Sequence, residues 1–528
     1  MTPRGNQRWG KNIVCDEAAR PARAAGQVEL SVHVALGALS QTALAPLAAS
    51  RALAVAEHLR LPYAVERVPL GVRGAHDGWA HRLSATGGGR LLWPREAQLA
   101  RPPGMLALRL PGREELPLCV RVLSDERVAA LLGPEAGDWS PVAPIRDRHG
   151  HAASIWRSAE GDVLLPFDPD EAVENLWTER YVEAMAGSGR GPAARLMLRG
   201  YYAVRRALPR RTQIWMRRHY ARVQARRPFP RWPAEPALHD FLELFLAILA
   251  DISGQPVPYI APWPDGHEWA LVLTHDVETA RGLERIEPLL ALERSLGLRS
   301  AWYFVPRRYD VPEEQLSTLR AEGCEVGVHG LHHDGRDLRS LGRLRERLPA
   351  MRAAAERWGA VGFRSPALHR HWDWMPMLGF DHDSSYPDCD PYEPQPGGCC
   401  SWWPVMNREL VELPLTMPQD HTLFTILGHQ DESAWVSKAQ LLRRRGGMAL
   451  VLTHPDYLGD GRALAAYRRL LERYGGDPAA WKALPAEVSA WWRRRHASRI
   501  VSDGRTWGIE GPAAAEARIE YAQERAWC

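Results

Sequence analysis

The sequence predicts an α/β protein with a (β/α) barrel in its C-terminal half, residues 255–495, and a separate α/β domain of unknown fold before it. Two observations predict the barrel. Short apolar segments alternate with helical stretches in this half, as in parallel strands joined by helical crossovers. Polar residues that bind metals or move protons follow one apolar segment after another. In a barrel, the carboxyl ends of the strands form the face that holds an active site.

Five short apolar segments are expected as strands of this barrel. They lie at residues 270–273, 326–328, 361–363, 410–415 and 448–452. The polar residues that follow these segments are Asp276, Glu278, His329, His333, Arg364 and His454. Because the carboxyl ends of parallel strands converge, we expect these side chains to meet in one site.

The histidine spacing indicates a metal site. His329 and His333 are four residues apart, so both imidazoles can reach one ion, and a carboxylate from the first strand would complete a two-histidine, one-carboxylate set. Such an ion acidifies a bound water and polarises a carbonyl. A second carboxylate is then available as general base and His454 as proton donor to the leaving group. Arg364 is suited to hold the base ionised through a bidentate contact.

These residues, in this order, resemble the motifs of the polysaccharide deacetylase family, also known as the NodB-homology or carbohydrate esterase family 4 domain. The resemblance covers residues 269–457, somewhat over a third of the chain. It implies a distorted (β/α) barrel that hydrolyses N- or O-acetyl groups on sugars with a divalent metal, most often zinc. Related proteins also cleave cyclic amides, so the resemblance does not select the substrate.

The first motif of the family is usually Thr-Phe-Asp-Asp, and this sequence reads Thr-His-Asp-Val-Glu from Thr274. The resemblance implies that Asp276 is the general base. Val277 stands where the family has its metal-binding Asp and cannot bind an ion. Glu278 is therefore expected as the ligand, as in an Asp-Val-Asp variant of the motif.

The second and third motifs supply the other ligands and the partner of the base. His329 and His333 match the family's His-(Ser/Thr)-x-x-His, with Gly330 in the hydroxyl position. His332 is an adjacent competitor. Arg364 matches the arginine that contacts the base in the family. The resemblance therefore implies two histidine ligands from one strand end and a base held from the next.

The last two motifs concern the groove and the acid. Asp383 and Tyr386 resemble the family's groove-lining Asp and Tyr, and a backbone N–H near Tyr386 is expected beside the developing oxyanion. Trp402 or Trp403 is expected to form the aromatic wall that stacks on a sugar ring. Ordinary packing is the alternative for these aromatic residues. His454, in Val-Leu-Thr-His, matches the family's general acid.

The N-terminal half carries no catalytic motif. Residues 1–27 are expected to be frayed, residues 28–183 to form the separate α/β domain, and residues 496–528 to form an appendage. The elements expected in this domain are helices at residues 32–59 and 170–181 and strands at residues 105–110 and 117–123.

Residues 184–254 are expected as a basic, Arg-rich helical connector. Residues 184–234 contain no Asp or Glu, and thirteen arginines lie between Arg190 and Arg231. A second helix is expected at residues 233–252. The apolar residues that predict an amphipathic helix inside the basic part are Ile214, Met216, Tyr220 and Val223. Two roles stay open for it: contact with anionic lipid or a diphosphate-bearing substrate, or packing of its arginines against acidic neighbours.

The composition limits the partners and the compartment. The chain has 67 Lys+Arg and 63 Asp+Glu, a net charge of +4, which argues against a dedicated nucleic-acid binder. No run of 18 apolar residues is present to span a membrane. Seven cysteines and no export signal indicate reduced thiols. We therefore expect a cytoplasmic protein, with a peripheral contact at the inner membrane face as the further option.

A metal-dependent deacetylase acting on an N-acetyl or O-acetyl group of a saccharide is the function that these observations favour. The saccharide is expected to be a cytoplasmic precursor of a surface polysaccharide. Two alternatives stay open: a metal-dependent hydrolase of a non-sugar amide or cyclic imide, and a catalytically inactive binding or scaffold protein in polysaccharide assembly. The missing second Asp of the first motif is the basis of the last alternative.

Overall fold

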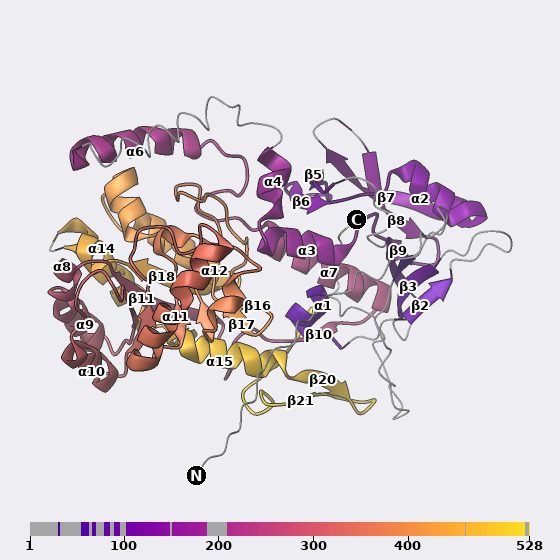
Figure 1. Ribbon diagram of the computed structural model, residues 1–528. Helices are drawn as coiled ribbons and strands as arrows, with labels where there is room; N and C mark the ends of the chain where they lie inside the picture. Colours follow the sequence, from indigo (N-terminus) through magenta and orange to yellow (C-terminus); the bar gives the residue numbers. More distant parts are fainter. Residues whose placement is uncertain are drawn as a thin grey trace, which may run out of the picture.

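The computed structural model contains two large sheets, one in each half of the chain (Figure 1). The predictions for residues 1–27, for most of the helix at 32–59 and for the arginines before residue 209 lie outside the residues that it describes. The described residues are 30–31, 54–62, 66–69, 79–84, 89–94, 102–147, 150, 152–186, 209–459, 461–522 and 527.

The first sheet is mixed and mainly antiparallel. Its strands run in the order β2-β3-β4-β9-β8-β7-β5-β6, with β1 paired to β4, and β4 and β9 are parallel. The strands predicted at residues 105–110 and 117–123 are β5 and β6. The strand bounds are β1 Leu30–Ser31, β2 Glu66–Pro69, β3 Trp79–Ser84, β4 Arg90–Pro94, β5 Gly104–Leu108, β6 Leu116–Val120, β7 Trp139–Asp147, β8 Ala152–Ser158 and β9 Val163–Leu164.

Short helices accompany this sheet. The helix predicted at residues 170–181 is divided into α3 and α4, because Glu179 adopts a left-handed backbone conformation with φ +58° between them. Asp168 caps α3 by accepting a hydrogen bond from the Asp170 N–H, and Pro169 stands in its first turn. The helix bounds are α1 Ala54–Leu59, α2 Asp125–Leu132, η2 Gly133–Asp138, α3 Pro169–Trp177 and α4 Arg180–Ala186.

The helix α7, Ala237–Ser253, belongs to the core of the first domain. It corresponds to the helix predicted at residues 233–252, which was expected as part of the connector 184–254. Its side chains are apolar on almost all sides, as in a helix surrounded by protein. Leu238, Phe241 and Leu249 are buried in one cluster with strand residues such as Leu118. The connector prediction is therefore wrong for α7.

The second sheet is the predicted barrel. Its order is β16-β17-β15-β14-β13-β12-β11-β18, with β19 paired to β11, and every pair is parallel except β16 with β17. The five predicted strands are β11, β13, β14, β17 and β18. The strand bounds are β11 Trp269–Val277, β12 Ala301–Phe304, β13 Glu325–Val328, β14 Gly362–Phe363, β15 His382–Asp383, β16 Val405–Asn407, β17 Leu410–Glu412, β18 Met448–Thr453 and β19 Ala480–Lys482.

The barrel closes through a seam that is not a regular strand ladder. After β17, the Thr416 hydroxyl donates a hydrogen bond to the Met448 carbonyl and accepts one from the Leu450 N–H. The Met417 N–H donates to the Leu450 carbonyl. These bonds join the segment after β17 to β18, so the barrel is complete but distorted at this point.

Helices cover the outside of the barrel, and α6 lies along its outer edge (Figure 1). Two of them follow strands β11 and β18 directly and help to shape the site, namely α8 and α13. The bounds are α6 Arg210–Gln224, α8 Ala280–Leu283, α9 Ile286–Ser295, α10 Glu313–Ala321, α11 Leu341–Trp358, η4 Pro366–Leu368, η5 Met375–Leu378, the π-helix η6 His421–Leu427, α12 Ser433–Arg444, α13 Pro455–Leu458, α14 Arg462–Tyr474 and α15 Pro485–His496.

The C-terminal segment is tied to both domains and is more than an appendage. Strands β20, Arg499–Ser502, and β21, Trp507–Glu510, form a hairpin, and β22, Ile519–Ala522, pairs with β10, Val257–Ile260. The Trp527 indole N–H donates to Asp251 of α7 at 2.9 Å. The part of residues 496–528 that the structure describes therefore links the barrel to the first domain.

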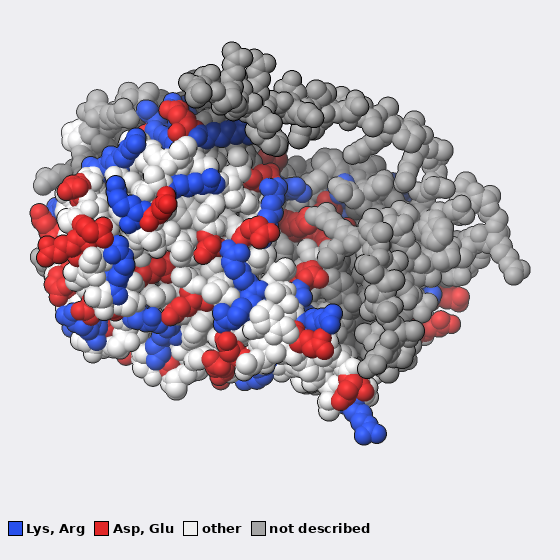
Figure 2. All heavy atoms as spheres, turned by 60° about the horizontal axis from the view of Figure 1, so that its bottom comes forward, with Lys and Arg blue, Asp and Glu red and all other residues white. Residues whose placement is uncertain are grey.

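No helix within the described ranges is both long and apolar enough to cross a bilayer. On the face shown in Figure 2, basic and acidic side chains are intermixed. The five cysteines whose placement is described are free and buried.

Candidate active site

The predicted catalytic and metal-binding residues meet at the carboxyl ends of the barrel strands. Asp276 lies near the end of β11 and Glu278 just beyond it, while His329 follows β13 and His454 follows β18. The parallel registers of β11 with β12 and β18, and of β12 with β13, bring these strand ends to one edge of the barrel. Every residue of β11 is buried. The site is therefore built from rigid, buried strand ends.

Glu278, His329 and His333 form a group that fits a metal ion. Each offers one ligand atom, and the three atoms lie within 4.8 Å of one another. His333 Nε2 lies 2.9 Å from a carboxylate oxygen of Glu278, yet this buried nitrogen has no hydrogen bond of acceptable geometry. An unsatisfied buried nitrogen calls for an explanation, and an ion shared with the carboxylate supplies one. Two imidazoles and one carboxylate are also a donor set of catalytic zinc sites.

His329 is oriented from behind by the neighbouring strand. Its Nδ1 lies 3.0 Å from the Arg364 carbonyl oxygen, so the Nδ1–H donates and Nε2 is left for a ligand bond. Burial lowers the pKa of His329 to about 4. The imidazole is therefore neutral at ordinary pH, which is the form that binds a metal.

The turn that carries His333 depends on a glycine. Gly330 has φ +63°, and a Cβ at this position would lie 2.5 Å from an Asp337 carboxylate oxygen. Asp337 accepts the Leu331 N–H at 3.1 Å and a hydrogen bond from Arg347 at 2.6 Å. The glycine that replaces the family's hydroxyl residue is thus required by the local backbone and by the close carboxylate.

Asp276 forms a buried ion pair with Arg364. Arg364 Nη1 lies 2.9 Å from Asp276 Oδ1 and 3.0 Å from the Thr274 hydroxyl, and Nε and Nη2 donate to the Ser384 carbonyl and hydroxyl. Burial alone would raise the pKa of Asp276, but the interactions with the neighbouring His329 and with the Arg364 guanidinium outweigh it and lower the pKa. Asp276 Oδ2 lies 3.6 Å from His329 Nε2. The free oxygen of an ionised carboxylate therefore faces the ligand group.

Glu278 is fixed by the segment after β18. Its carboxylate accepts a hydrogen bond from the Tyr457 hydroxyl at 2.8 Å, and its backbone N–H donates to Asp456 at 3.0 Å. Burial would raise the pKa of Glu278, but the contact with His333 outweighs it and holds the pKa well below its usual value. Val277 is fully buried in the barrel core. The carboxylate ligand is therefore Glu278, one residue after the position where the family has its metal-binding Asp. This change leaves β11 intact and brings the Glu278 carboxylate to the histidines.

His454 is paired with Asp420, a residue that the sequence reasoning missed. His454 Nδ1 lies 2.7 Å from Asp420 Oδ1, and its backbone N–H donates to Asp420 Oδ2 at 2.9 Å. Burial would lower the pKa of His454, but Asp420 outweighs it and raises the pKa to about 10. Its Nε2 lies 4.0 Å from Glu278 Oε1. His454 is thus a protonated imidazole whose Nε2 lies beside the Glu278 carboxylate of the ligand group.

Asp383 and Tyr386 are buried residues next to the strand ends that carry the site, and they do not line a groove. Asp383 accepts hydrogen bonds from the N–H and hydroxyl of Ser385, and the Ser385 hydroxyl accepts the Ser365 N–H. The Tyr386 N–H donates to Glu412 at 3.0 Å, so it is not aimed at an oxyanion. Both side chains are buried in the barrel interior. The substrate-binding prediction is therefore wrong for this pair, which braces the strand ends around Arg364.

Trp402 and Trp403 lie at the other end of the barrel. The Trp402 carbonyl accepts the N–H of Met448, the first residue of β18, and the Trp403 indole donates to the Gly446 carbonyl at 2.7 Å. The Trp402 ring stacks on His239 of α7 with centroids 4.5 Å apart. A strand as long as β18 separates them from His454, roughly 3.3 Å for each residue. The predicted stacking of these two rings on a sugar is wrong, because they pack against the first domain.

The other histidines of the two motifs do not join the ligand group. His275 is fully buried, with Nδ1 2.8 Å from the Thr453 hydroxyl and Nε2 2.8 Å from Glu293. His332 is half-buried. Among the residues that the structure describes, the only group of three or more potential ligands close enough for one ion is Glu278, His329 and His333.

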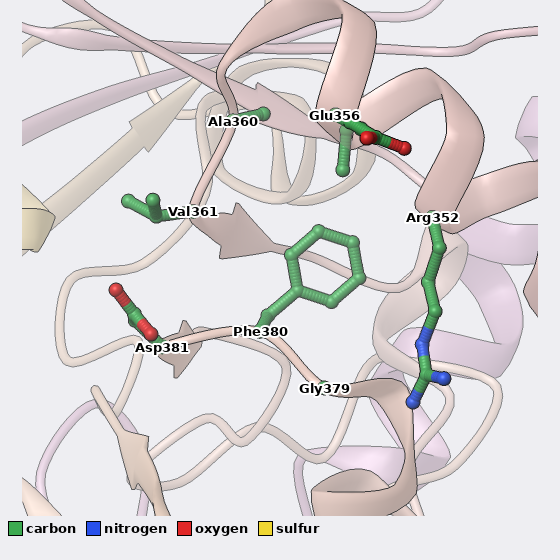
Figure 3. A pocket seen from close by; sticks show the side chains of 8 residues that line it. Arg352, Glu356, Ala360, Val361, Gly379, Phe380 and Asp381 are labelled. Carbon is green, nitrogen blue, oxygen red and sulfur yellow. The ribbon is translucent and has the colours of Figure 1, made fainter.

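A cavity of about 300 Å³ lies away from this site. It is lined by Arg352 and Glu356 of α11 and by residues 360–361 and 379–381, and Figure 3 shows the Phe380 ring beside it. Val361 precedes β14 and Asp381 precedes β15, so the cavity is at the amino ends of the strands. In barrels this end serves stability, and the chemistry takes place at the carboxyl ends.

The chain resembles several solved structures. No family model and no curated protein matches it. Two solved proteins, from Mycobacterium smegmatis and Pseudomonas aeruginosa PAO1, are named as polysaccharide deacetylases and share 20% and 18% identity with it. The matches cover 44% and 47% of this chain and 93% and 98% of those chains, with TM-scores of 0.36 and 0.35. A third, PuuE allantoinase, has 14% identity and a TM-score of 0.34, and covers 44% of this chain and 92% of its own.

Proposed function

We propose that this protein is a metal-dependent hydrolase that removes an acetyl group from an amino or hydroxyl group of a saccharide. One observation carries the proposal. The ligand atoms of Glu278, His329 and His333 lie within 4.8 Å of one another. A buried Asp276–Arg364 pair lies beside His329, and a buried His454–Asp420 pair lies beside Glu278. This arrangement combines a metal site, a general base and a general acid, which together are the requirements of amide or ester hydrolysis.

Glu278, His329 and His333 would hold the ion. Zinc is the metal that two imidazoles and one carboxylate suit best, with a further position open to water or substrate. When bound, a divalent ion supplies Lewis acidity, which makes water easier to deprotonate and a carbonyl carbon easier to attack. The hydrogen bond from His329 to the Arg364 carbonyl and that from Tyr457 to Glu278 keep two of the ligands oriented.

Asp276 acts as the general base. Its Oδ1 is held by Arg364 at 2.9 Å, and its Oδ2 is turned to the ligand group. The arginine lowers the pKa of Asp276 against the effect of burial, so the carboxylate is ionised at neutral pH. Oδ2 accepts a proton from the attacking water while the water oxygen bonds to the acetyl carbon.

His454 acts as the general acid. Asp420 holds its Nδ1 and, against the effect of burial, raises its pKa to about 10, so Nε2 carries a proton at neutral pH. His454 gives this proton to the leaving nitrogen or oxygen as the bond to the acetyl carbon breaks. The products are acetic acid, which ionises to acetate, and a free amine or hydroxyl. Asp276 then releases the proton it took from water and His454 takes up a proton from solvent, which restores the starting state.

Metal content and acetate release test the proposal together. Protein that has been stripped and reloaded with zinc is expected to hold about one ion for each chain and to release acetate from some member of a panel of N- and O-acetylated saccharides. The Glu278→Gln variant is expected to lose both metal and activity, whereas the neighbouring His332→Gln variant should keep both. Full metal content and full acetate release in Glu278→Gln would refute the ligand assignment, and a metal-free, inactive wild type would leave the scaffold alternative.

A second candidate is the hydrolysis of a non-sugar amide or cyclic imide. The observation in its favour is the position of the aromatic residues that were expected to stack on a sugar ring. Tyr386 is buried and Trp402 and Trp403 pack at the opposite end of the barrel. The same panel extended with N-acyl amines and cyclic imides decides between the two, because ring opening of an imide releases no acetate.

A further inference from the structure

The helix α6 is a cationic helix on the outside of the barrel. It contains no acidic residue over Arg210–Gln224, and Figure 1 shows it as the outermost helix along one edge. Its inner face is anchored on the catalytic domain. The Gln224 side chain donates to the Pro391 carbonyl at 2.6 Å, and Ala221 is buried with Tyr392 and Ile426. The helix is therefore a fixed part of the barrel surface.

The outer face of α6 joins apolar and basic side chains. Trp215 is 59% exposed and Val223, one of the apolar residues that predicted an amphipathic helix, is 61% exposed. Arg218 and Arg222 are exposed as well. Trp215, Arg218 and Arg222 share the spacing i, i+3 and i+7, which places them along one stripe of the helix. We refer to Trp215, Arg218, Arg222 and Val223 as the outer face of α6.

The arginines of this face are not neutralised by nearby acids. Arg218 donates to the Thr425 carbonyl, and neither Arg218 nor Arg222 forms an ion pair with any described residue. Some exposed arginines elsewhere are paired with an acid, whereas others, such as Arg345 and Arg444, form no ion pair with any described residue. Arg343 pairs with Glu346 at 2.7 Å, and the face in Figure 2 shows both charge signs intermixed. The second role left open for the basic segment, packing against acidic patches, is therefore not observed for these two arginines.

We propose that the outer face of α6 docks the protein on an anionic lipid surface. Arginines are drawn to anionic headgroups within about a Debye length of the membrane. A tryptophan ring sits well at the headgroup level, and an adjacent aliphatic side chain gains from the acyl boundary. A nucleic-acid surface would also attract the arginines, but it offers no comparable environment for an exposed valine. The combination of exposed Trp, Val and unpaired Arg on one helix favours lipid.

Docking through this face would bring the catalytic site close to the lipid. The helix packs on η6, which begins immediately after Asp420, the partner of His454. Arg217, on the inner side, donates to the Tyr392 carbonyl at 3.3 Å. The docking itself requires neither the metal nor the reaction, so it stands or fails independently of the proposed activity.

Co-sedimentation with vesicles tests the docking. The full chain is mixed with phosphatidylcholine vesicles, with and without phosphatidylglycerol, at low and at high salt. We expect binding to the anionic vesicles that weakens as salt rises and little binding to the neutral ones. Arg222→Glu is expected to weaken the binding roughly tenfold, and Trp215→Ser several-fold.

The matched control is Arg505→Glu, a charge reversal at an exposed residue in the turn of the β20–β21 hairpin, which lies on the other side of the molecule from α6 (Figure 1). It should bind within about twofold of wild type. Equal weakening by Arg222→Glu and Arg505→Glu would mean that net charge alone drives binding and would overturn the assignment to α6. Equal binding to neutral vesicles, or none to anionic ones, would overturn it too, as would binding to single-stranded RNA that is stronger than to anionic vesicles and indifferent to Trp215→Ser.

Discussion

The two ends of the barrel are built from the same strands and hold opposite kinds of residues. At the carboxyl ends, buried charged side chains are held by several hydrogen bonds each, as Arg364 is by Asp276, Thr274 and Ser384. At the amino ends, aromatic rings such as Trp402 pack against the first domain. Burying charge is unfavourable unless every charge is paired. The buried charges at the carboxyl ends therefore lower the stability of the fold or leave it unchanged, whereas the packed aromatic rings at the amino ends raise it.

This difference teaches where substitutions should affect chemistry and where they should affect folding. A change among the paired charges removes a catalytic group but leaves the apolar core in place. A change among the packed rings removes buried apolar area but lies a full strand away from the reacting atoms. Four predictions separate these effects, and each would contradict the comparison if a substitution at one end of the barrel changed the quantity expected to change only at the other end.

The Asp276→Asn substitution should have the largest effect. Asparagine keeps the shape and can accept from Arg364, but it cannot take a proton from water, so kcat should fall by up to roughly 10⁴-fold. Since Asp276 is not one of the ligand residues, the metal content should stay at the wild-type level. Steady-state acetate release and elemental analysis measure the two quantities. Loss of metal together with activity would show that Asp276 is a ligand and not a base.

The Trp402→Ala substitution should come next and should act on stability. The side chain is fully buried, stacks on His239 and donates to Asp388 at 3.2 Å. Removing a buried ring of this size costs about 3–5 kcal/mol, which a denaturant titration measures. The kcat of the remaining folded protein should not change, and Trp402→Phe should recover most of the stability. A fall in kcat without a loss of stability would show that Trp402 contributes to the substrate site and would contradict its assignment to packing.

The Asp420→Asn substitution should lower kcat by roughly 10²-fold and change the pH profile. Asp420 outweighs the burial of His454 and raises its pKa from 6.5 to about 10, so the acid is protonated over most of the range. Without the carboxylate this pKa falls, and the alkaline limb of kcat/KM should move to lower pH. The raised pKa also stabilises the fold below pH 6.5, a contribution that is lost as the pH rises through about 10. An unshifted alkaline limb would exclude His454 as the acid.

The sequence was sufficient to predict the ligand group but not the whole site. His329, His333 and a carboxylate after the first strand are local signals, and the resemblance to the family selected Glu278 as that carboxylate. The structure brings the three ligand atoms together. Asp420 could not be found in this way, because it lies in a loop beyond the predicted strand at residues 410–415 and reaches His454 only through the closure of the barrel. The signal in the sequence that could have identified Asp420 is its position as a carboxylate a few residues after a predicted barrel strand.

The prediction that Trp402 and Trp403 stack on a sugar ring was wrong for a related reason. Trp402 and Trp403 were expected to form the aromatic wall of the family's groove, with ordinary packing as the alternative, and which of the two applies depends on what the other domain contributes. The stacking partner His239 belongs to α7, 163 residues earlier in the chain. The apolar residues of α7 predicted a helix, and its place in the first domain's core depends on contacts distant in sequence.

The smallest effect is expected on β14, where the two ends of the barrel are only three residues apart. Val361, at the amino end, is 38% exposed beside the cavity of Figure 3, whereas Arg364, at the carboxyl end, is fully buried. Val361→Thr should change the free energy of unfolding by less than about 0.5 kcal/mol and leave kcat unchanged. Arg364→Lys keeps the charge but loses the planar fork that reaches Asp276 and Ser384 together, so kcat should fall roughly tenfold or more. Comparable effects of the two substitutions on kcat would mean that the ends of this strand are not functionally distinct. A change confined to Arg364→Lys would place the boundary between stability and chemistry within one short strand.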